Sequence, residues 1–220
     1  MLPLRTNCRL TIIAIIALGL TLTAQTRRKT TPTPPANPPA THTATHTEDP
    51  QLYQNPIFGF RYQIPYGWVD RTQQMQEGSE TGKAELLLAT FERPPEATGD
   101  TVNSAVVIAS ESTAAYPGLT KAEDYLAPLT ELATSKGLKP EGEPYPLEVE
   151  SRHLLRADFT KLLSIKTTSV KTTNDKLTMR QCTLVLLAKG HIVSFTFIAG
   201  SEDELDDLMD GLHFVAAKSP

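Results

Sequence analysis

Cysteine is scarce in this chain of 220 residues, which contains only two. Cys8 lies near the N-terminus, just before an apolar run, so only Cys182 belongs to the part expected to fold. A single thiol cannot form an internal disulfide, and the fold must therefore be held by its core. Because Cys182 stands in a strand-like run, we expect a buried and unreactive thiol.

No apolar run in the sequence has the length of a typical membrane-spanning helix. Residues 10–24 are free of charge but fall short of the about 20 residues that a span needs. Arg5 and Arg9 precede the run and Ala24 supplies a small residue for cleavage, as in a secretory signal peptide. We predict a signal peptide over residues 1–24 and no membrane span after its cleavage. An uncleaved N-terminal anchor is the alternative, because a basic cluster follows the run.

The chain also lacks an excess of positive charge. Its formal net charge is −4 at pH 7. A protein of this charge gains no attraction to the phosphates of nucleic acid or to an anionic membrane surface. We therefore expect no nucleic acid among its partners.

Motifs of familiar catalytic and cofactor sites are missing from the sequence. Residues 78–82 imitate a G-x-S-x-G elbow but carry Glu80 where the nucleophilic serine would stand. The sequence has no phosphate-binding loop, no dinucleotide fingerprint and no paired His or Cys metal motif. We predict no catalytic residue, no metal ligand and no cofactor.

Residues 25–50 differ in composition from the rest of the chain. They are rich in Thr and Pro and contain no aliphatic residue larger than Ala. Such a segment cannot bury enough apolar surface to offset the entropy of ordering it. We predict a disordered linker that acts as a semi-rigid spacer.

The remaining residues, 51–217, are predicted to form a single α+β domain. Its clearest pattern is the alternation over residues 58–64, which places every second side chain on one face of a strand. The residues of the expected buried face are Phe58, Phe60, Tyr62 and Ile64.

Further segments predict an antiparallel sheet of about six strands packed by two main helices. The later strands are expected at 84–91, 104–110, 147–149, 153–161, 179–188 and 192–199, with the polar run 171–176 closing a hairpin. Helices are predicted over 121–136 and 202–212, each opened by a capping-box pattern, and residues 72–82 are predicted to be a loop. Pro128 implies a kink near Leu126 or two short helices that abut there.

The opening F-G-F-x-Y-x-x-P-x-G-W segment, residues 58–68, resembles the start of the PsbP family. A mid-chain helix, a late antiparallel hairpin and a closing helix extend the resemblance over about residues 53–215. The resemblance implies an α/β/α sandwich and a non-enzymatic role as a binding or assembly partner. No docking or metal-binding motif of that family is matched, so no site residue follows from it.

Polar side chains on two predicted strands form the candidate ligand face. Arg61 and Gln63 lie opposite the aromatic face of the first strand, and Arg156 and Asp158 share the polar side of a later one. If the two faces converge, they would hold a small polar ligand. The alternative is that Arg156 and Asp158 only pair with each other.

These observations favour an exported, non-catalytic binding or assembly module of the bacterial cell envelope, secreted or periplasmic, with an envelope protein as its partner. Two alternatives remain open from the sequence. One is a secreted hydrolase whose site matches no known motif, and the other is a carrier of a small ligand or metal.

Overall fold

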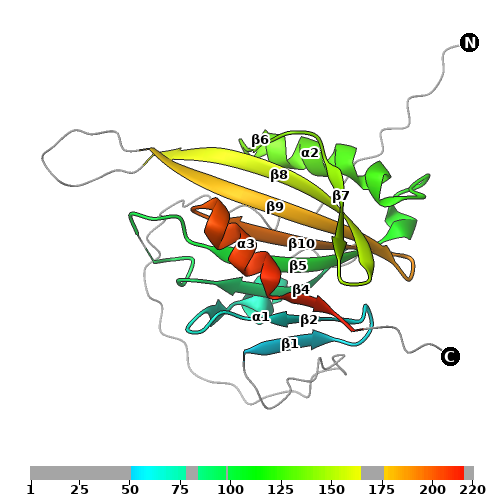
Figure 1. Cartoon of the computed structure of the whole chain (residues 1–220), viewed down its shortest axis with the longest axis horizontal. Coiled ribbons are helices and arrows are strands. Elements are labelled where there is room, and N and C mark those ends of the chain that lie inside the picture. The colour runs from blue at the N-terminus through cyan, green and yellow to red at the C-terminus, as the bar shows by residue number, and fades with distance from the viewer. Residues whose placement is uncertain (1–50, 78–83, 98, 165–175, 216–220) are drawn as a thin grey trace, which may run out of the picture.

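An eight-stranded antiparallel sheet forms the central layer of the protein. The computed structural model describes residues 51–77, 84–97, 99–164 and 176–215. Along the sheet the strands follow the order β3-β4-β5-β10-β9-β8-β6, and β7 also pairs with β8 (Figure 1). The strands are β3 Val69–Asp70, β4 Ala84–Phe91, β5 Ala105–Ser112, β6 Lys139–Pro140, β7 Tyr145–Val149, β8 Arg152–Ser164, β9 Lys176–Ala188 and β10 His191–Ala199.

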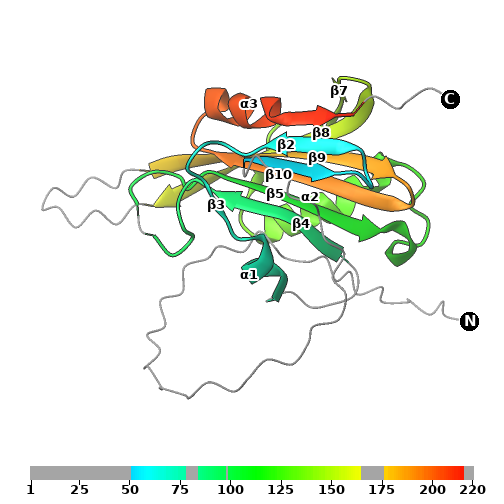
Figure 2. The same cartoon turned by 90° about the horizontal axis from the view of Figure 1, so that it is seen from below.

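A second, three-stranded sheet and the last helix cover one face of the central sheet. This small sheet has the order β1-β2-β11, with β1 at Leu52–Asn55, β2 at Phe60–Gln63 and β11 at Leu212–Phe214. Helix α3, Glu202–Asp210, leads directly into β11. The opposite face carries α2, Leu126–Ser135, and the short α1, Thr72–Glu77, as the side view in Figure 2 shows. The predicted α+β class is thus confirmed.

The aromatic face of β2 is buried between the two sheets, as the alternation predicts. Phe60 and Tyr62 are 1% and 0% exposed, and Phe58 and Ile64 are buried beside them. They share one core with the inward side chains of β9 and β10 and with Leu205 and Leu208 of α3. Burial of one aromatic side chain contributes about 1.5–3 kcal/mol, so this face is a main source of stability.

The mid-chain helix is divided where Pro128 predicts. A 3₁₀ helix over Ala122–Tyr125 passes into α2 at Leu126. Pro128 then lies in the first turn of α2, where backbone N–H groups have no intrahelical partner and its missing donor costs little. The cap of the 3₁₀ helix is formed by Asp124, whose carboxylate accepts from the backbone of Thr120 and Lys121, and not by the expected Glu123.

Several sequence-based expectations were wrong in detail. The main sheet has eight strands where about six were expected, and the small sheet adds β1 and β11. Residues 72–77, predicted as loop, form α1. The last helix ends at Asp210, since Leu212 already belongs to β11. Most of the predicted connection at 171–176 lies outside the described residues, as do the predicted signal peptide and linker.

The start of α3 is capped and is also hydrogen-bonded to Ser104, the residue just before β5. The Ser201 hydroxyl accepts from the backbone N–H of Glu204, which confirms the capping residue. The Glu204 carboxylate accepts from the Gly200 backbone and from the buried Ser104 hydroxyl, at 2.9 and 2.5 Å. These bonds fix the position of α3 over the sheet.

A buried carboxylate holds the segment between β5 and α2 against the other face. Glu111, near the end of β5, is 6% exposed. It accepts a hydrogen bond from the Tyr125 hydroxyl at 2.5 Å and another from the Tyr116 hydroxyl. Burial, together with the nearby negative charge of Glu111, raises the pKa of both tyrosines, so both remain donors at neutral pH.

Replacing Tyr125 by Phe is expected to lower the free energy of unfolding by about 1–3 kcal/mol, because one buried oxygen of Glu111 loses its donor. Urea denaturation monitored by circular dichroism measures the difference. Tyr66→Phe is the matched control, since Tyr66 is 91% exposed and should leave stability unchanged. Equal stability of the Tyr125→Phe variant and the wild type would contradict the role given to this contact.

Candidate functional site

A polar hollow of about 200 Å³ opens between α3 and the β8–β9 part of the central sheet. Its walls come from the sheet, from the segment after β6 and from α3. The lining residues are Glu141, Arg156, Asp158, Phe159, Arg180, Gln181, Glu202 and Leu205.

Strand alternation determines which side chains face the hollow. On β8, Arg156 and Asp158 point to the α3 side, while Ala157 and Phe159 belong to the core under α2. On β9, Arg180 contacts α3, which places it and Cys182 on the same side. The register sets Asp158 opposite Cys182, so a carboxylate and a thiol meet across the strand pair.

Arg156 and Asp158 form a close ion pair on the floor of the hollow. The Nε atom of Arg156 donates to both carboxylate oxygens of Asp158, at 3.0 and 2.9 Å. Both side chains are 18% exposed, so solvent screens the pair only in part. The Arg156 guanidinium also lies 5.7 Å from the ring centre of Tyr145, within the range of a cation–π contact.

Arg180 bridges two walls of the hollow. Its Nη1 atom lies 3.3 Å from a carboxylate oxygen of Glu141, and its Nη2 atom lies 3.1 Å from one of Glu202. Glu141 is itself anchored, because its backbone N–H donates to the carbonyl of Asp158 at 2.8 Å. The start of α3 is thereby tied to the segment between β6 and β7.

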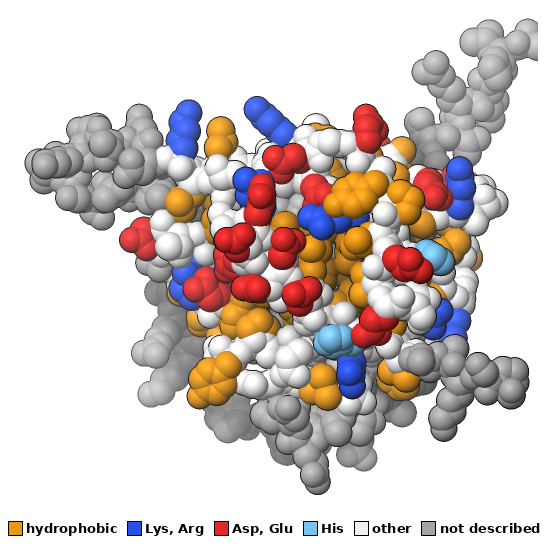
Figure 3. All heavy atoms as spheres, in the orientation of Figure 1, with side chains coloured by type: hydrophobic (Ala, Val, Ile, Leu, Met, Phe, Trp, Pro, Cys, Tyr) orange, Lys and Arg blue, Asp and Glu red, His pale blue; other side chains and the backbone are white. Residues whose placement is uncertain are grey.

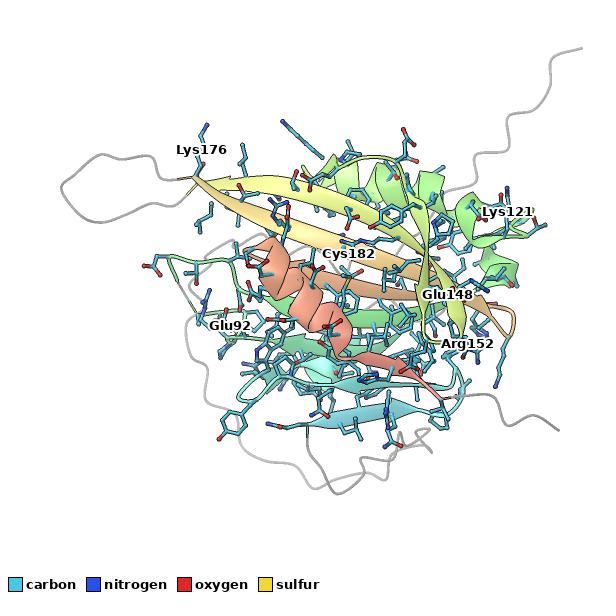
Figure 4. All side chains as sticks on the ribbon, in the orientation of Figure 1. Glu92, Lys121, Glu148, Arg152, Lys176 and Cys182 are labelled. Atoms are coloured by element: carbon cyan, nitrogen blue, oxygen red, sulfur yellow. The ribbon has the colours of Figure 1, made fainter. Side chains whose placement is uncertain are left out.

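Cys182 lies behind the ion pair, in β9 near α3 (Figure 4). Its side chain is completely buried, as predicted. Burial raises the pKa of the Cys182 thiol, Arg156 lowers it, and the charge of Asp158 together with its hydrogen bond raises it further. The thiol therefore keeps its proton at neutral pH and is a poor nucleophile.

The structure divides the four residues of the predicted ligand face. Arg156 and Asp158 line the hollow and pair with each other. Arg61 and Gln63 are exposed on β2 and are not part of the hollow. Arg61 lies opposite His213 of β11, and the Gln63 amide donates to the backbone of Gln51.

Sequence reasoning missed the other three charged residues of the hollow, namely Glu141, Arg180 and Glu202. Arg180 carries a weak sign, since it alternates with Cys182 in a strand-like run. Glu141 lies next to the missed strand β6, and Glu202 is one of several acids in a helical segment predicted to be merely solvated. Only the three-dimensional arrangement brings these residues together.

Metal-binding clusters and membrane-spanning helices are both missing from the described ranges. There, no group of three or more His, Cys, Asp or Glu side chains is placed to hold a metal ion. Among the same residues, no helix has the length and apolar character needed to cross a membrane.

Comparison with known proteins gives similarity of fold. No family model matches the chain, and no curated protein matches it in sequence. The structure is similar to cyanobacterial PsbP (CyanoP) from Synechocystis sp. PCC 6803, with a TM-score of 0.48 and 12% identity over 75% of this chain and 92% of that one. It is also similar to LpqN, involved in cell envelope biogenesis of Mycobacterium tuberculosis, with a TM-score of 0.35 and 15% identity over 77% and 83% of the two chains. The protein of unknown function PA94 from Pseudomonas aeruginosa gives 0.32 and 16% over 72% and 88%. A PsbP protein is thus among the similar structures, in keeping with the resemblance stated from the opening strand.

Cys182 is expected to react with a disulfide reagent at least about 100-fold more slowly in the native chain than in the urea-unfolded chain, because the thiol is buried and protonated. The measurement uses the full chain with Cys8→Ser, so that a single thiol is followed at about pH 8. Labelling at similar rates in the two states would show that Cys182 is accessible.

Replacing Asp158 by Asn is expected to lower the free energy of unfolding by about 1–3 kcal/mol, because the partly buried Arg156 loses a charged partner. Because Cys182 is reached only when the structure opens, the less stable variant should also be labelled faster than the wild type. Asp207→Asn, an exposed acid of α3, is the control and should change neither quantity. A stable variant with an unchanged labelling rate would refute this account of the ion pair.

Proposed function

We propose that this chain is an exported, non-catalytic binding or assembly module of the cell envelope, and that the hollow beside α3 receives a side chain of its protein partner. The observation that carries the proposal is the hollow itself, a small recess whose charged groups are held in position by ion pairs.

The size of the hollow favours a side chain over a free small molecule. Pockets that enclose drug-sized ligands usually measure about 300–1,000 Å³. The hollow measures about 200 Å³, and one of its lining residues, Arg156, lies under the exposed ring of Tyr145. A single long side chain from a docked surface fits such a recess.

The charges in and around the hollow suit recognition better than proton transfer. A general acid or base works best when its pKa lies near the working pH. Burial raises the pKa of Cys182 and of Tyr145, so both groups remain protonated at neutral pH. Arg156 and Arg180 are each held by carboxylates, which orient the two guanidinium groups.

The predicted N-terminal segments support a role in the cell envelope. A signal peptide over residues 1–24 would direct export, and the Pro- and Thr-rich residues 25–50 would act as a spacer. In the polyproline II conformation, a spacer of that length would span about 80 Å. A domain carried on such a spacer would reach a partner even if the N-terminal segment remained as an anchor.

Site-specific photo-crosslinking tests the proposal in cells that export the full chain. Benzoylphenylalanine in place of Tyr145, whose ring lies over Arg156 of the hollow, is expected to yield a discrete adduct with one protein. The same substitution at Tyr66, which is also an exposed tyrosine, is the matched control and should not yield that adduct. Absence of an adduct at Tyr145, or an identical adduct at both positions, would refute the proposal.

A further inference from the structure

Beyond the hollow, α3 and β7 form the two sides of a longer recess, which we name the α3–β7 groove. At one end Arg180 ties Glu202 to Glu141, just before β7. At the other end Glu150, just after β7, accepts from the backbone of Phe214 at 2.8 Å, in the strand that follows α3. Between these ties, Figure 3 shows hydrophobic side chains in a depression beside the acidic side chains of α3.

The helix side of the groove is strongly acidic. Helix α3 has no basic residue, and its acids are Glu202, Asp203, Glu204, Asp206, Asp207 and Asp210. This one helix therefore carries more negative charge than the formal net charge of −4 for the whole chain. Asp206 lies one helical turn after Glu202, which lines the hollow, so the two acids share one face of α3.

The acids of α3 exceed what the helix itself requires. Negative side chains stabilise the first turn of a helix, and Glu202, Asp203 and Glu204 occupy that turn. Asp206, Asp207 and Asp210 follow it, and Asp210 stands at the negative end of the helix, where no basic residue offsets it. An acidic residue at the negative end of a helix is locally unfavourable, and such a placement is expected where the surface serves binding.

The strand side of the groove is apolar. Leu147 and Val149 of β7 are partly buried against the main core, and Tyr145 is 43% exposed. Among the described strands, β7 pairs only with β8, so its other edge is open. Pro146 lies in this edge strand and has no backbone N–H, which weakens the edge as a template for strand addition. Recognition therefore rests on side chains.

We infer that the α3–β7 groove binds a short, extended segment of a partner protein in which basic and apolar residues alternate. The inference rests on the proposed function and names the chemistry of its partner. The basic heads would meet Asp206 and Glu202, and the apolar side chains would pack on Leu147 and Val149. Helix α3, with nine residues, is about 13 Å long, which matches about four residues of extended chain.

The test uses fluorescent six-residue peptides and the full chain, with binding measured by fluorescence anisotropy. One peptide alternates Lys and Leu, a second alternates Glu and Leu, and a third alternates Lys and Ser. The Lys/Leu peptide should bind at least about tenfold more tightly than either of the others, and less tightly at high salt. Equal binding of the three peptides, or none, overturns the inference.

Asp206→Lys should weaken binding of the Lys/Leu peptide at least about tenfold, because a wall charge is reversed. Glu131→Lys is the matched control, with the same charge change on an exposed residue of α2, across the central sheet. Thermal unfolding establishes that each variant is folded, and Asp206→Asn serves in place of Asp206→Lys if that variant is not. Equal effects at Asp206 and Glu131 overturn the inference.

Two further outcomes separate this inference from the proposed function. If benzoylphenylalanine at Tyr145 captures a partner and Asp206→Lys leaves that adduct unchanged, the proposed function stands and the basic partner is refuted. If the peptide binds only after Arg27, Arg28 and Lys29 are changed to Ser, the groove belongs to this chain's own basic segment. That result also overturns the inference.

Discussion

The packing of three phenylalanine rings joins the two sheets, and the position of the groove depends on it. Phe60 of β2 meets Phe195 of β10 edge-on at 5.0 Å, and Phe214 of β11 contacts both rings at 6.4 and 6.0 Å. Edge-to-face pairs of this kind add about 0.5–1.5 kcal/mol each to the burial of the rings. Because β11 follows α3 directly, a ring cluster that fixes β11 also fixes the end of α3. The Ser104–Glu204 hydrogen bond fixes the beginning of α3. Because both ends of the helix are fixed, α3 cannot move toward β7 and close the groove.

Long periodic segments could be predicted from the sequence, and short ones could not. Strand β4 was predicted with its observed bounds, and each residue of the buried face of β2 was predicted correctly. Alternation over many residues is compatible with only one choice of buried face. Strands of two to four residues, such as β3, β6 and β11, are too short to show a period and form only because a longer strand offers an edge. Helix α1 was missed because its sequence TQQMQE contains one apolar residue, Met75, which packs on β4 and β5.

The residues of the candidate site were harder to predict from the sequence than the strands and helices. Alternation placed Arg156 and Asp158 on one side of β8, and their pairing could be foreseen from their spacing. That Arg61 would lie elsewhere depends on β2 belonging to a separate sheet, which no local pattern reveals. The other charged residues of the hollow are Glu141, Arg180 and Glu202. They come together only through the register of β6, β8 and β9 and the position of α3 on the sheet. Local sequence patterns do not reveal either feature.

The polar floor of the hollow is better explained by specificity than by stability. Bringing a guanidinium and a carboxylate out of water costs several kcal/mol per ion, and their attraction often does no more than offset this. Apolar side chains at 156 and 158 would continue the core that Leu184 and Leu154 already form. Retaining the pair instead keeps a fixed pattern of charge beside α3, and Cys182, completely buried beneath it, leaves solvent access to the pair only from the hollow. A surface arranged in this way can reject partners with the wrong charge, because each mispaired group would be left without the solvent that normally compensates it.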